Sequence, residues 1–132
     1  MKKIKQIVTH YPLSVLCIIM VWILSLTPFF PETPLDNVAL IDKWTHTVMY
    51  GGLACTIWCE YFSNHQHVDW KKLAFWGWLA PILMSGMLEL IQEYCTMGHR
   101  NGDWLDFAAN AIGASLGATV GLLVKYSWIK AQ

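Results

Sequence analysis

Four long apolar segments separated by short polar connections constrain the fold of this 132-residue chain more than any other feature. They cover about residues 12–30, 43–62, 73–94 and 104–124. A membrane-spanning helix needs about 20 mostly apolar residues to cross a hydrocarbon core of ~30 Å. Only 14% of the residues are charged, compared with roughly 25% in soluble domains. The pattern predicts an all-α fold, a single membrane domain over residues 1–132 that forms a bundle of four transmembrane helices.

The first apolar segment has a second interpretation. A lysine-rich head followed by an apolar core is also typical of a secretory signal peptide. The segment ends in the sequence PFFP at residues 28–31, which offers no pair of small residues for cleavage. Leu16, which precedes Cys17, is too large for a lipoprotein cleavage site. We therefore expect an uncleaved first helix.

The basic residues predict the orientation of the bundle. The head, the connection at residues 63–72 and the tail contain Lys2, Lys3, Lys5, Lys71, Lys72, Lys125 and Lys130, whereas the other two connections contain only Lys43 and Arg100. Lysine and arginine accumulate in cytoplasmic loops. We therefore expect both termini in the cytoplasm, with residues 31–43 and 95–103 facing outward. The net charge of zero gives no indication of a nucleic-acid partner.

Polar residues gather at the outer end of three segments. Helical spacing places Asp42, His46 and Tyr50 on one face, Glu89 and Gln92 on another, and Asp106, Asn110, Gly113 and Gly117 on a third. At ~1.5 Å per residue, Tyr50, Glu89 and Asn110 each lie roughly 9 Å below the outer edge of their helices. Ionisable groups inside a membrane are costly and mark functional sites by default. The sequence therefore predicts one polar site below the outer surface.

Three of these residues suit proton transfer, and we expect His46, Glu89 and Asp106 to be catalytic. A neutral histidine beside a carboxylate is a plausible general base, because the carboxylate orients and stabilises the imidazolium. Glu89 lies deepest of the carboxylates and is the candidate acid. The competing interpretation is that these side chains only hydrogen-bond to one another and hold the helices together.

The remaining polar residues are candidates for substrate binding: Asp42, Lys43, Tyr50, Gln92, Arg100 and Asn110. A guanidinium binds a phosphate or carboxylate through two parallel hydrogen bonds, so Lys43 and Arg100 would hold an anion. Alternatively, Arg100 pairs with neighbouring acids, and Asn110 only holds helices together. Gly113 and Gly117 form a small-residue stripe for helix packing. The sequence leaves open whether that packing is within one chain or in a homo-oligomer.

A metal site is the weaker alternative for the same residues. His46, Glu89, Asp106 and His99 are residue types that bind Zn²⁺ or a harder cation. Their spacing matches no established metal-binding motif. The sequence therefore predicts neither a metal nor another cofactor.

The order of the polar residues resembles a known family. The matching pattern is Asp42-Lys43-x2-His46-x3-Tyr50, then Glu89-x2-Gln92, then Arg100-x5-Asp106-x3-Asn110-x2-Gly113-x3-Gly117. Over about residues 41–121 it is similar to the VanZ-like bacterial membrane proteins, named for a protein linked to low-level teicoplanin resistance. The resemblance implies a multi-pass protein of the bacterial cytoplasmic membrane. One departure is Gly98-His99 before Arg100, where the family pattern has Pro-Gly.

Three functions are consistent with this resemblance. The first is an enzyme that acts on a lipid-linked or envelope-associated substrate in the outer leaflet. The second is a non-catalytic accessory protein that binds membrane lipids, an envelope precursor or a glycopeptide-related ligand. The third is a small proton-coupled transporter, which ranks last because the polar groups lie at only one membrane face. Whether the protein is an enzyme stays open.

Overall fold

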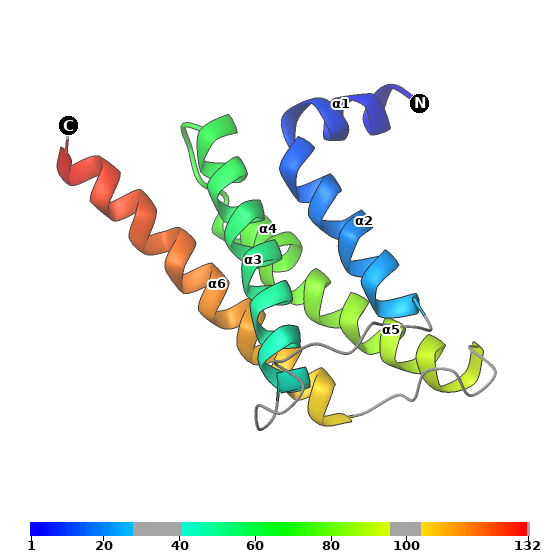
Figure 1. Ribbon diagram of the computed structural model, residues 1–132. Helices are drawn as coiled ribbons and strands as arrows, with labels where there is room; N and C mark the ends of the chain where they lie inside the picture. Colours follow the sequence, from blue (N-terminus) through cyan, green and yellow to red (C-terminus); the bar gives the residue numbers. More distant parts are fainter. Residues whose placement is uncertain (28–40, 96–103, 132) are drawn as a thin grey trace.

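The computed structural model describes residues 1–27, 41–95 and 104–131, apart from the side chain of Asp42 (Figure 1). The elements are α1 (Lys2–His10), α2 (Pro12–Leu26), α3 (Ile41–Asn64), α4 (Trp70–Ala74), the π-helical turn η2 (Phe75–Leu79), α5 (Ala80–Cys95) and α6 (Trp104–Ala131). All regular structure in these ranges is helical, so the all-α prediction is confirmed for them. The predicted role of Arg100, the turn before it and most of the two outward connections lie outside the described residues.

The helices are long and apolar enough for a membrane protein. Within the described residues, two stretches qualify as spans, Trp70–Cys95 with 26 residues and Trp104–Ala131 with 28. A third qualifies if α1 and α2, which are bent by 97°, form one broken span. α3 is not among the candidates, although its 24 residues are enough to cross a bilayer. Its charged residues near both ends, Lys43 and Glu60 among them, make it less apolar.

Several helix ends differ from the predicted ones. The last helix continues seven residues past the predicted end at 124, and the expected basic head forms the separate helix α1. Hydrophobicity predicts where a chain meets lipid, whereas a helix continues for as long as its backbone hydrogen bonds do. In α1 the apolar residues Ile4, Ile7 and Val8 are all exposed. This helix therefore packs little against the rest of the bundle.

α3 is the central helix, and its most extensive contact is with α6. The two helices start at the same end of the bundle and run in the same direction (Figure 1). Along the interface Gly113 lies against the backbone of Thr47, Gly117 against the backbone of Gly51, and Gly121 against Trp58. A Cβ atom at any of these glycines would lie closer than 3.0 Å to α3. The glycine stripe therefore permits a helix contact that larger residues would prevent.

The π-helical turn η2 precedes Pro81 in α5. Proline has no backbone N–H, so Pro81 cannot donate to the carbonyl oxygen of Gly77 four residues earlier. The indole Nε1 of Trp58 donates to this oxygen at 3.1 Å in a buried contact. α3 thus supplies a hydrogen bond to a backbone carbonyl to which Pro81 cannot donate.

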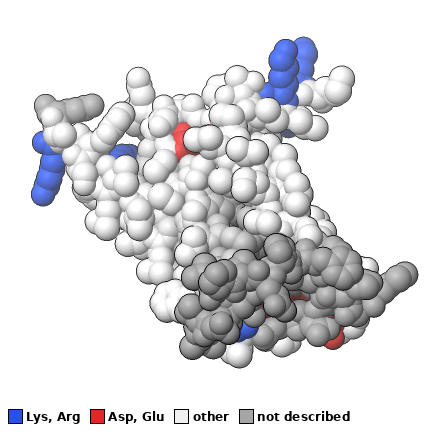
Figure 2. All heavy atoms as spheres, in the orientation of Figure 1, with Lys and Arg blue, Asp and Glu red and all other residues white. Residues whose placement is uncertain are grey.

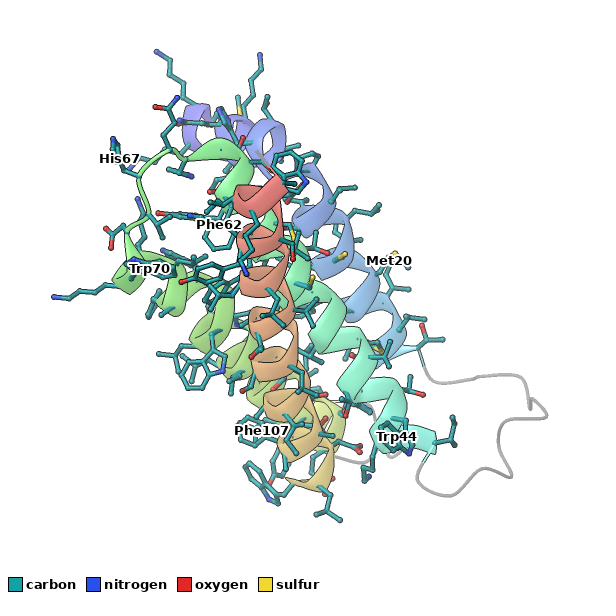
Figure 3. The ribbon with its side chains drawn as sticks, turned by 90° about the vertical axis from the view of Figure 1, so that its left-hand side faces the viewer. Met20, Trp44, Phe62, His67, Trp70 and Phe107 are labelled. Atoms are coloured by element: carbon teal, nitrogen blue, oxygen red, sulfur yellow. The ribbon has the colours of Figure 1, made fainter. Side chains whose placement is uncertain are left out.

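Charged and aromatic side chains mark the two ends of the bundle. On the face drawn in Figure 2, charged residues lie towards both ends and a broad uncharged band separates them. In Figure 3, Trp44 and Phe107 lie near one end, and Phe62, His67 and Trp70 lie near the other. Tryptophan is enriched where a membrane meets water. The distribution is therefore typical of a protein embedded in a bilayer.

Candidate functional site

The candidate site lies at the end of the bundle where α3 and α6 begin and α5 ends. We call it the polar cluster and define it as Lys43, His46, Glu89, Asp106 and Asn110. One ligand atom from each of His46, Glu89 and Asp106 lies within 4.8 Å of the others. Three helices therefore bring together side chains that are up to 60 positions apart in the sequence (from 46 to 106).

Asn110 orients the ring of His46. The Nδ1 atom of His46 lies 3.0 Å from the side-chain oxygen of Asn110. An amide oxygen only accepts, so Nδ1 carries the proton of this hydrogen bond. The other ring nitrogen, Nε2, faces a carboxylate oxygen of Asp106 at 3.6 Å. That distance is too long for a hydrogen bond, so Nε2 and Asp106 are neighbours across a short gap.

Lys43 holds the second oxygen of the Asp106 carboxylate. Its ammonium nitrogen lies 2.5 Å from Oδ1, and the Lys43 and Asp106 side chains are 24% and 14% exposed. The predicted anion-binding lysine therefore has an acidic partner inside the protein. A bound anion would have to compete with Asp106 for this cation.

Glu89 and Asn110 are the most deeply placed members of the polar cluster, with 5% and 1% of their surface exposed. Tyr50, one turn along α3 from His46, is also buried and packs in a core cluster with Leu53 and Leu88. It lies within electrostatic range of Glu89. Helix geometry predicts that Tyr50, Glu89 and Asn110 lie at one depth. All three are buried, and Tyr50 and Asn110 lie one helical turn deeper than His46 and Asp106.

Gln92 connects α5 to a different neighbour. Its side-chain nitrogen donates to the backbone carbonyl of Ser25 at 2.6 Å, at the end of α2. Gln92 is almost fully buried. This contact joins α5 to the end of α2, and the predicted substrate-binding role of Gln92 stays a prediction.

The structure thus brings together five of the predicted site residues. Gly113 and Gly117 lie below them in the α3–α6 contact. The side chain of Asp42 and all of Arg100 lie outside the described residues. The catalytic and substrate-binding roles stay predictions.

A second carboxylate contact, which the sequence analysis missed, lies at the far end of α3. Glu60 accepts hydrogen bonds from the backbone N–H groups of Leu13 at 2.8 Å and Ser14 at 3.0 Å. It also accepts from the Ser14 hydroxyl at 2.5 Å. The first N–H groups of a helix have no partner within it, so Glu60 caps α2 from another helix. A lone glutamate in an apolar segment is a sequence signal for a buried polar contact. The sequence does not identify its partners, because they lie 46 and 47 residues away.

Comparison with known proteins gives no relative. No family model, curated protein or solved structure matches this chain. The resemblance to the VanZ-like family therefore depends on the residue pattern alone. Chemically, the polar cluster combines an oriented imidazole, two carboxylates, an ammonium and an amide at one end of an apolar bundle.

Proposed function

We propose that this chain is a VanZ-like protein of the bacterial cytoplasmic membrane whose outward-facing polar cluster binds or acts on a lipid-linked envelope component. The observation that carries the proposal is the convergence of His46, Glu89 and Asp106 from three helices. Burial of charged groups at such a depth costs free energy, so a protein keeps them only where they serve packing or function. Packing alone would be served by one pair of hydrogen-bonded residues.

The partial exposure of the site supports access for a ligand. The side chains of Lys43, His46 and Asp106 are 24%, 13% and 14% exposed, whereas Glu89 lies deeper. A ligand would therefore meet the ammonium and the imidazole first. The substrate class follows from the ammonium, because this group binds phosphate or carboxylate.

Four spans with both termini in the cytoplasm form part of the proposal. The two termini lie at the same end of the bundle, opposite the starts of α3 and α6 (Figure 1). α1 combines Lys2, Lys3 and Lys5 with exposed Ile4 and Ile7, and it turns by 97° from α2. A helix of this kind lies along a membrane surface with its lysines at anionic headgroups. This position suits the cytoplasmic side and leaves the polar cluster facing outward.

A non-catalytic binding protein is the second candidate function. The Lys43–Asp106 ion pair favours it, because it neutralises part of the cluster without a substrate. A binder needs the shape and charge of the cluster, whereas an enzyme needs the ionisable atoms of His46 and Glu89. Conservative substitutions therefore separate the two.

The test is teicoplanin protection of a sensitive bacterial host, measured with the folded yield of each variant in detergent. The variants are His46→Gln, Glu89→Gln and Asp106→Asn. The matched controls are His67→Gln, in the exposed connection after α3, and Glu93→Gln, exposed one turn beyond Glu89 on α5. We expect the three cluster variants to fold like wild type and to lose protection, while both controls keep it.

Complete loss of protection in folded variants indicates an enzyme, and graded loss indicates a binding protein. Misfolding of all three cluster variants would identify the cluster as a structural network and overturn the proposed site. If the wild-type chain does not protect the host, the link to glycopeptide susceptibility is wrong for this protein.

A further inference from the structure

We propose that His46, Glu89 and Asp106 bind one divalent transition-metal ion, for which Zn²⁺ is the best match. The inference rests on the proposed function in one respect, since both require these residues to form a working site. It adds the chemical nature of the ligand that the cluster binds first. The argument comes from donor geometry, from the residues that orient two of the donors and from the chemistry of the donor atoms.

The donor atoms already have nearly the separation that a metal ion requires. Two ligands on a tetrahedral Zn²⁺, each bonded at ~2.0 Å, lie about 3.3 Å apart. His46 Nε2 and Asp106 Oδ2 are 3.6 Å apart. Because this distance is too long for a hydrogen bond, no direct bond between the two would have to be broken. A Glu89 oxygen completes the set within 4.8 Å, which small side-chain rotations can close.

The neighbouring residues orient the donors as outer-shell partners do in metal sites. A metal-bound histidine usually donates its other ring N–H to a fixed acceptor, which sets the tautomer. Asn110 accepts from His46 Nδ1 at 3.0 Å, so the lone pair of Nε2 faces the carboxylates. Lys43 binds Oδ1 of Asp106, and the other carboxylate oxygen, Oδ2, faces His46. Two residues outside the donor set thus fix two of the three donors.

The donor types of the cluster suit a metal cation. Glu89 and Asp106 offer carboxylate oxygens, and His46 offers a ring nitrogen. Glu89 is only 5% exposed, so a cation bonded to it would be largely shielded from water. Mixed nitrogen and oxygen donors suit Zn²⁺ and its neighbours, whereas Mg²⁺ and Ca²⁺ prefer oxygen ligands alone.

The number of protein ligands predicts what else binds there. Zinc sites with three protein ligands keep a fourth position for water or a substrate atom. In this site that position would take an anionic oxygen, such as that of a phosphate. The metal would therefore supply the anion affinity that Lys43, paired with Asp106, supplies only in part.

The experiment uses the full-length protein in detergent micelles, freed of metal with a chelator. Zn²⁺ binding is titrated by calorimetry, and Co²⁺ is added separately as a spectroscopic probe. We expect one tight site per chain and saturable visible absorption from Co²⁺ in a low-coordinate nitrogen and oxygen environment. The variants are His46→Gln, Glu89→Gln and Asp106→Asn, with His67→Gln and Glu93→Gln as controls.

Each ligand variant should weaken Zn²⁺ binding by more than the roughly 10–100-fold that follows loss of an outer-shell partner. Asn110→Ala should fall within that roughly 10–100-fold range. Lys43→Met removes an outer-shell partner of Asp106 and also a positive charge beside the metal. These two effects oppose each other, so its affinity should fall less than that of Asn110→Ala. Both controls should bind like wild type.

Equal Zn²⁺ affinity in wild type and the three ligand variants would overturn the metal site. The absence of a saturable Co²⁺ spectrum in the wild type would do the same, even if the variants fail to fold. Protection against teicoplanin is recorded in parallel. Metal binding without protection rejects the proposed function and keeps the metal site, whereas protection that depends on the cluster without metal binding rejects only the metal site.

Discussion

The two ends of α3 use carboxylates in different ways. At one end Glu60 accepts two backbone N–H groups and a hydroxyl, all from the start of α2. At the other end Asp106 and Glu89 approach His46 from two further helices. The first carboxylate is bound to backbone, whereas the second group consists of side chains that can each exchange a proton or bind a ligand.

The difference shows how to interpret a polar residue in an apolar bundle. A carboxylate that caps a helix has partners whose positions the backbone fixes, so its contribution is to stability. A cluster of ionisable side chains stabilises the fold less efficiently, because removing charges from water is costly even when they are paired. The partners of a buried carboxylate therefore separate a structural role from a functional one better than its burial does.

The largest expected effect is at the α3–α6 contact, which lies between the two ends of α3. In Gly117→Val a side chain would collide with the backbone of Gly51, so α6 must move away from α3. We expect loss of most folded protein, since overpacking against rigid backbone exceeds the roughly 1–3 kcal/mol of ordinary overpacked sites. Folded yield by size exclusion in detergent measures the effect. Gly52→Val is the control, because nothing lies within 4 Å of its Cβ position. Similar yields for the two variants would refute the close α3–α6 contact.

A paired substitution tests the comparison directly. Glu60→Ala leaves the first N–H groups of α2 without their acceptor, and we expect a loss of about 1–2 kcal/mol in the free energy of unfolding. Glu89→Gln should change stability less and abolish protection. Unfolding by a denaturing detergent, followed by circular dichroism, gives the free energies. If Glu89→Gln proves the more destabilising of the two, the assigned roles of the two ends are reversed.

The smallest effect concerns the π-helical turn. Trp58→Phe keeps most of the aromatic packing and removes the indole N–H that binds the Gly77 carbonyl. We expect a loss of about 1 kcal/mol in the free energy of unfolding. Trp78→Phe serves as the control, because its indole bonds to Ser115 at an exposed position. Equal losses of unfolding free energy in both variants would mean that the buried Trp58 hydrogen bond stabilises the fold no more than the exposed Trp78 one.

Much of the candidate site could be predicted from the sequence. Four-residue spacing on α3 and α6 places His46, Asn110 and the glycines on inward faces, because helix geometry alone fixes which residues share a face. The glycine stripe predicts a close helix contact, and its partner proves to be α3 of the same chain. The pairing of Lys43 with Asp106 could not be predicted, since several acids lie near it in the sequence and only the packing selects one.

The sequence by itself determined the helical class and the gathering of polar residues at one end, because apolar run length and helical periodicity are local properties of the chain. The tertiary structure alone decided which side chains meet. Glu60 binds the start of α2 across 46 residues. Gln92 donates to the Ser25 carbonyl at the end of α2, and Trp58 of α3 donates to the Gly77 carbonyl, to which Pro81 cannot donate. Such contacts depend on the rotation and depth of each helix against its neighbours, which no local pattern encodes.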